Sequence, residues 1–85
     1  GTAYVYPNPA TAGSGAVRIG GLSGAVTGEI RDLQGNRVRS IHADPVANAV
    51  WDLRDDAGLP VAPGIYLLQL RDAGRVITLR LAVTR

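Results

Sequence analysis

The sequence predicts an all-β domain in which about seven short strands form two packed sheets. No stretch of ten or more residues carries the apolar stripe of an amphipathic helix. Apolar and polar residues instead alternate in short runs, which eleven glycines and five prolines separate at intervals near ten residues. Strands that each have one apolar face are best buried in a sandwich. A closed barrel fits less well, because the strands are short and unequal.

The first half of the chain contains four predicted strands. Residues 3–6 form the first strand, which stops at Pro7, Asn8 and Pro9, because two prolines around one residue make a stiff extended corner. Small polar residues then predict a loop over 11–15. The next three strands are predicted over residues 16–22, 25–33 and 37–42, the last two joined by a hairpin turn at 34–36.

The second half is organised around the stretch from Trp51 to Leu70. Trp51 is the only tryptophan and is expected to anchor the core. After a loop over 43–47, strands are predicted over residues 49–53, 64–71 and 75–83. A polar loop with two prolines joins the first pair, and a turn at 72–74 joins the second pair. The last hairpin is expected to be central in its sheet, with inward-facing Ile77, Leu79, Leu81 and Val83.

Length and composition exclude several classes of protein. The 85 residues fit a single domain spanning 1–85, with residues 1–3 assignable to a linker. There is no cysteine for a disulfide or a thiolate metal site. Nine arginines and no lysine give a scattered net charge of +2, which argues against a nucleic-acid partner. No apolar stretch is long enough for stable membrane insertion, and no signal peptide is visible.

Residues that could carry chemistry do not form a credible active site. His42 is the only histidine, and no serine lies in a nucleophile elbow. Asp52, Asp55 and Asp56 could offer oxygen ligands to calcium, but their spacing does not match an EF-hand, and turn capping is favoured. We therefore expect neither an enzyme nor a cofactor.

Four motifs carry a resemblance to a known family. They are Tyr6-Pro7-Asn8-Pro9, the Asp32-Leu33-Gln34-Gly35 turn, the segment from Trp51 to Tyr66 that reads WDLRDDAGLPVAPGIY, and the ending from Arg80 to Arg85. In this order the chain resembles the C-terminal sorting domain, type A, of the bacterial type IX secretion system (Por secretion). The middle segment also resembles the Ig-like domain of the flagellar hook-capping protein.

The resemblance implies an Ig-like antiparallel β-sandwich that serves as a non-catalytic address for an attached N-terminal cargo domain. Family members are exported to the periplasm, recognised there by the type IX translocon and delivered to the cell surface or the medium. A sortase-like protease of the system commonly removes the domain, and here the cut would fall upstream of Tyr6.

Particular residues match the family motifs. Translocon recognition is expected at the ending, which offers a surface for docking or for pairing at a strand edge. Arg80 stands where family members often have lysine; the charge is kept, but a lysine-specific contact is not. The recognition residues are Arg80, Leu81, Ala82, Val83, Thr84 and Arg85, and the other motif residues are Pro7, Asn8, Pro9, Trp51, Asp52, Gly64 and Tyr66.

Two other functions stay open at this point. The domain could be an Ig-like structural or assembly module, as in hook capping. It could also be a carbohydrate-binding accessory module of an extracellular enzyme, with Tyr4 or Tyr6 as a sugar-stacking platform. The sequence leaves open the cargo, the cleavage site and the oligomeric state.

Overall fold

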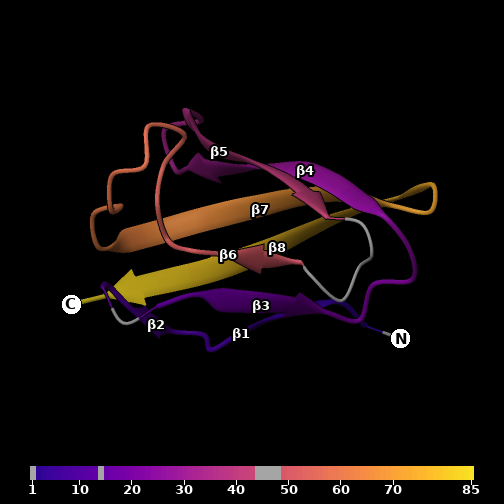
Figure 1. Cartoon of the computed structure of the whole chain (residues 1–85), viewed down its shortest axis with the longest axis horizontal. Helices are drawn as coiled ribbons and strands as arrows, with labels where there is room; N and C mark the ends of the chain where they lie inside the picture. Colours follow the sequence, from indigo (N-terminus) through magenta and orange to yellow (C-terminus); the bar gives the residue numbers. More distant parts are fainter. Residues whose placement is uncertain (1, 14, 44–48) are drawn as a thin grey trace.

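The computed structural model describes residues 2–13, 15–43 and 49–85, and it confirms an all-β fold of two sheets (Figure 1). The smaller sheet has the strand order β1-β3-β6, and the larger has the order β2-β8-β7-β4-β5. No helix that could cross a bilayer occurs in these ranges. Residues 44–47 of the predicted loop over 43–47 lie outside the described residues, and so do Gly1 and Ser14. The strands are β1 Tyr4–Tyr6, β2 Ala10–Thr11, β3 Val17–Gly20, β4 Val26–Asp32, β5 Arg37–Ala43, β6 Val50–Trp51, β7 Gly64–Asp72 and β8 Arg75–Thr84.

The β7–β8 hairpin is the longest pairing in the molecule, in register from Gly64 opposite Val83 to Asp72 opposite Arg75. Its turn consists of Ala73 and Gly74, which both have positive φ, at 50° and 85°. Two such residues form the turn type whose twist matches that of the flanking strands. The prediction of a central hairpin holds for β7, whereas β8 has only the two-residue β2 on its other side.

A β-bulge between β4 and β5 explains an irregular sequence pattern. Ile30 lies opposite Arg39 while Arg31 lies opposite Arg37, so Val38 is an extra residue in β5. A bulge shifts the alternation by one residue. That shift is why Ile41, rather than a residue in phase with Val38, is buried in the core.

The predicted strand 49–53 is shorter in the structure. Trp51 and Leu53 are buried and Asp52 is exposed, as the alternation predicts. The ladder nevertheless ends at Trp51, because Leu53 adopts a φ of 61°, which an extended strand does not allow.

The predicted loop over 11–15 was wrong at its first residue, because β2 includes Thr11 and runs parallel to the end of β8. A two-residue parallel strand has no pattern of alternation from which to predict it. Pro7 to Pro9 therefore carry the chain from the small sheet to the edge of the large one, with cis peptide bonds before both prolines.

The core lies between the two sheets. Trp51 is 1% exposed and meets the ring of Tyr66 edge to face, with the ring centres 5.6 Å apart. The prediction that Trp51 anchors the core is therefore confirmed. The same core cluster contains side chains from both sheets, among them Val17, Ile19, Val26, Ile30, Leu68, Leu70, Leu81 and Val83.

Candidate recognition site at the C-terminal strand

The end of β8 alternates between buried and exposed side chains. Leu81 and Val83 are 0% and 3% exposed, and Ala82 is half-buried. Arg80, Thr84 and Arg85 are exposed. Only part of the predicted recognition set therefore offers side chains on the surface of the folded domain, and the two buried residues hold the strand against the core.

Asn8 binds the backbone of this strand with its side chain. Its Nδ2 donates to the carbonyl oxygen of Arg80 at 2.8 Å, and its Oδ1 accepts from the amide of Ala82 at 3.1 Å. These are the two bonds that a neighbouring strand would make, and an amide side chain can both donate and accept. Two motifs 72 residues apart in sequence are thus joined in space.

The segment after Asn8 continues the pairing along the same edge. The amide of Ala12 donates to the Thr84 carbonyl, and the Thr84 hydroxyl donates to the Ala10 carbonyl at 3.2 Å. The expected edge pairing with a partner therefore meets an edge that this chain already fills from Arg80 to Thr84. The side chains of Arg80, Thr84 and Arg85 remain exposed beside this filled edge.

The other motif residues surround Trp51. Its indole Nε1 donates to the Arg54 carbonyl at 2.9 Å. The Tyr66 hydroxyl donates to the Ala62 carbonyl, and burial, with the nearby Asp32 charge, raises the pKa of Tyr66. Gly64 lies opposite Val83 in the β7–β8 ladder. Trp51, Gly64 and Tyr66 therefore have a structural role. Their contacts position the loop before β7 and the strand beside the C-terminus.

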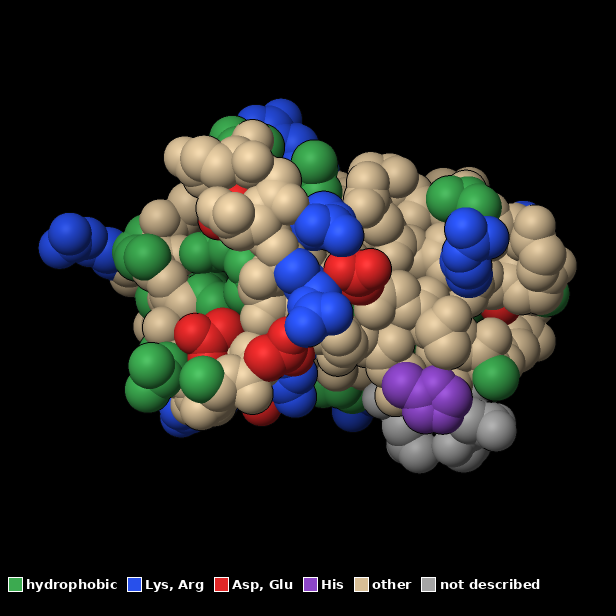
Figure 2. All heavy atoms as spheres, turned by 90° about the horizontal axis from the view of Figure 1, so that it is seen from above, with side chains coloured by type: hydrophobic (Ala, Val, Ile, Leu, Met, Phe, Trp, Pro, Cys, Tyr) green, Lys and Arg blue, Asp and Glu red, His purple; other side chains and the backbone are tan. Residues whose placement is uncertain are grey.

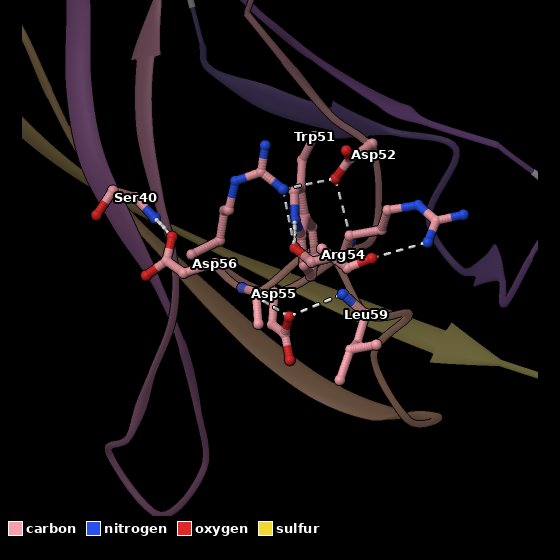
Figure 3. Close-up of polar contacts among 10 residues, drawn as sticks. Ser40, Trp51, Asp52, Arg54, Asp55, Asp56 and Leu59 are labelled. Atoms are coloured by element: carbon pink, nitrogen blue, oxygen red, sulfur yellow. Dashed lines mark hydrogen bonds and ion pairs between the residues drawn. The ribbon is translucent and has the colours of Figure 1, made fainter.

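The carboxylates of the loop that contains Asp52, Asp55 and Asp56 accept hydrogen bonds from backbone amides (Figure 3). Asp55 Oδ1 accepts from the amides of Ala57 and Leu59, both at 2.9 Å. Asp56 Oδ1 accepts from the amide of Ser40 at 3.1 Å, which ties the loop to β5. The predicted turn-capping role is confirmed for Asp55, whereas Asp56 binds an amide of β5. Within the described residues, no three acidic or histidine side chains gather as ligands for a metal ion.

Arginines flank the same loop, and Figure 2 shows basic and acidic groups interleaved over the centre of this face. Arg39 donates to Asp52 at 2.8 Å, and Arg37 lies 3.3 Å from Asp56. Both pairs are solvent-exposed, so each contributes at most about 1 kcal/mol to stability. They hold the loop in place without forming a charged patch of one sign.

Sequence reasoning missed the role of Asp72, which it assigned to a turn. The side chain is fully buried, and it accepts hydrogen bonds from Ser23, from the Gly24 amide and from Arg75 at 2.8 Å. The Arg75 guanidinium, helped by these other donors, holds the pKa of Asp72 below its usual value despite burial. Its partners at 23–24 are 48 residues or more away, and no local pattern indicates that pairing.

Two tyrosines considered for carbohydrate binding lie on β1 at 57% and 66% exposure. The Tyr4 ring covers Gly20, whose missing side chain leaves room for it. Tyr4, Tyr6 and Arg18 line an open hollow of about 290 Å³ on the outer face of the small sheet. His42, the other residue considered for chemistry, is exposed on β5.

The solved structures similar to this chain include two from Porphyromonas gingivalis. A domain of PorZ, an essential bacterial surface component of the type IX secretion system of Porphyromonas gingivalis, has a TM-score of 0.77 and 28% identity over 98% of this chain. Dimeric latent PorU from the same organism has a TM-score of 0.63 and 19% identity over 96% of this chain. No protein-family model and no curated protein sequence matches.

The chain spans only 11% of PorZ and 9% of PorU, so the likeness concerns one domain of each. The PorU likeness, at 19% identity, shows the fold alone. PorZ is a component of the type IX secretion system, so the predicted relation to that system is confirmed.

Proposed function

We propose, from this relation to the type IX secretion system, that the chain is a non-catalytic export signal read by the type IX translocon. One observation carries the proposal: 28% identity and a shared fold over 98% of the chain with a domain of a surface component of that system. The attached N-terminal cargo would pass through the periplasm to the cell surface or the medium. A sortase-like protease would cut upstream of Tyr6 during export.

The C-terminal strand is suited to be the part that is read. Arg80, Thr84 and Arg85 are exposed, and the backbone from Arg80 to Thr84 is held by Asn8 and β2. An ordered strand presents these side chains in one arrangement, which lowers the entropy lost on binding. The buried neighbours Leu81 and Val83 contribute through the fold, and not by direct contact.

The test is export of a reporter fused ahead of this domain in a type IX-competent bacterium. We expect the intact fusion in the medium or on the surface, and an Arg80→Glu fusion retained in the periplasm. Arg71→Glu is the matched control, because Arg71 is exposed on the neighbouring strand and makes no ion pair within the described residues. That control should be exported normally.

One result would contradict the proposed export role, and another would contradict only the proposed site of recognition. If the intact fusion stays in the periplasm, an Ig-like structural or assembly module becomes the better account. If both arginine variants are exported like the intact fusion, the domain is an export signal that the translocon recognises at residues other than Arg80.

A second candidate function rests on the hollow beside Tyr4 and Tyr6. Exposed aromatic rings next to an arginine suit a sugar ring with polar substituents. A carbohydrate-binding role requires that the domain is retained on a glycan support and that Tyr4→Ala with Tyr6→Ala abolishes retention. A domain that no glycan retains is not such a module.

A further inference from the structure

The end of the sandwich that carries the C-terminus exposes apolar side chains on its loops. Leu33, in the turn after β4, is 64% exposed, and Leu59, in the loop before β7, is 62% exposed. Pro60, Ala62 and Pro63 beside them are exposed as well. Figure 2 shows hydrophobic side chains gathered around a hollow at this end, with acidic groups next to them. We call this surface, residues 32–36 with 55–63, the terminal face.

Two adjoining hollows cut into the terminal face, and Asp32, Ala62 and Tyr66 line both. One has a volume of about 350 Å³ and reaches Leu33 and Pro63. The other has about 260 Å³ and reaches Asp55 and Pro60. Exposed apolar residues around shaped hollows mark protein interaction sites more often than bare surface.

The charge within the second hollow is negative. Asp32 and Asp55 accept bonds from backbone amides, and neither pairs with an arginine in the described part of the chain. The one arginine lining this hollow, Arg37, is already paired with Asp56 at 3.3 Å. The Asn36 amide holds the pKa of Asp32 below its usual value, so this carboxylate is charged at neutral pH.

The groups that would touch a ligand are also held in place. The Asp32 carboxylate caps Gln34 and Asn36, and the Asp55 carboxylate caps Ala57 and Leu59. A preorganised surface loses little conformational entropy on binding. Anionic lipid is disfavoured as an occupant, because two carboxylates with no arginine partner among the described residues line the hollow.

We propose that the terminal face docks a segment of a partner protein in which leucine-like side chains flank a lysine or arginine. The apolar side chains cover Leu33 and Leu59, and the cation enters the hollow between Asp32 and Asp55. No residue from Arg80 to Arg85 lines the two hollows, and binding at the terminal face does not depend on the export role.

The test uses the whole domain, labelled with nitrogen-15, and three synthetic peptides. The first has the core Leu-Arg-Leu between capped glycines, the second has Leu-Glu-Leu and the third has Ser-Arg-Ser. We expect the first peptide to shift the amide signals of 32–36 and 59–66. The other two should bind at least about tenfold more weakly, since each lacks either the complementary charge or the apolar contact.

Variants of exposed residues locate the effect without disturbing the core. Leu33→Ser and Leu59→Ser are expected to weaken binding of the first peptide at least about threefold each. Val76→Ser is the matched control, because Val76 is 67% exposed beside the β7–β8 turn at the other end of the sandwich. Equal shifts with Leu-Glu-Leu, no shift with Leu-Arg-Leu, or an equal loss with Val76→Ser would each overturn the proposal.

Discussion

At the scale of single residues, Asn8 shows why one side chain can matter more than its exposure suggests. The amide replaces a strand at the edge of β8, since it donates to Arg80 and accepts from Ala82. Aspartate has nearly the same shape but lacks the donor, and it would place a negative charge beside the Arg80 carbonyl. The flanking prolines have no amide hydrogen, so they leave no unpaired donor at this corner.

Asn8→Asp is therefore expected to loosen the C-terminal strand. We expect a loss of about 1–2 kcal/mol in the free energy of unfolding, the usual range for one or two hydrogen bonds in such a place. Hydrogen exchange should quicken at the Ala82 amide and stay unchanged in the β4–β5 hairpin. Unchanged stability together with unchanged exchange at Ala82 would show that the strand does not need the bond from Asn8 to the Arg80 carbonyl.

At the scale of elements, long alternating runs could be predicted and short or irregular pieces could not. The β7–β8 hairpin followed from alternation and from the residues at its turn. The bulge at Val38 did not, because its extra residue shows in the sequence only as Ile41 out of phase. β2 was missed because its pairing with β8 is parallel and joins residues more than 70 positions apart.

The candidate site was likewise only partly predictable from the sequence. The recognition ending and the motif residues could be named from the sequence, but their burial and partners required the fold. Leu81 and Val83 could be expected inside from alternation, whereas the clamp by Asn8 and the burial of Asp72 depend on contacts made only after the sheets have formed.

The Asp72 contact, which joins the turn at 23–24 to the last hairpin, predicts a pH dependence. Its folded-state pKa lies below the unfolded value, which is about 3.9. The stability that it contributes is complete above that unfolded value and is lost as the pH falls through the folded one. We expect the melting temperature to fall on acidification below about pH 4.

Two variants isolate this contribution. Asp72→Asn should melt lower at pH 7 and lose less on acidification, while Asp32, whose pKa is also lowered, keeps part of the acid dependence. Ser23→Ala, which retains the carboxylate and removes only one of its donors, should keep most of the acid dependence. Parallel acid profiles for Asp72→Asn and the unmodified domain would refute this assignment.

At the scale of the whole molecule, the proposed address and the core share one strand. β8 supplies exposed Arg80 and Thr84, which Arg85 follows, and it also supplies buried Leu81 and Val83. The core of an 85-residue domain is modest, so such domains have little stability to spare. Loss of export after truncation therefore has two explanations, a missing signal or an unfolded domain.

Deleting residues 80–85 is expected to unfold most of the domain at 37 °C. Leu81 and Val83 each contribute about 1.5–3 kcal/mol by burial, and a domain of this size has about 5–10 kcal/mol in all. The deletion also removes the partners of Asn8 and β2. Deleting Arg85 alone should shift the melting temperature by no more than about 2 °C, because the residue is exposed.

The fluorescence of Trp51, the single tryptophan, reports on both variants because the ring is buried between the sheets. If the 80–85 deletion melts like the intact domain, β8 is dispensable for folding beyond Leu79, and export of that deletion becomes a direct test of recognition. If it melts far lower, recognition can be judged only from variants that stay folded, such as Arg80→Glu. A variant that stays folded but is not exported would show that recognition, and not folding, has been lost.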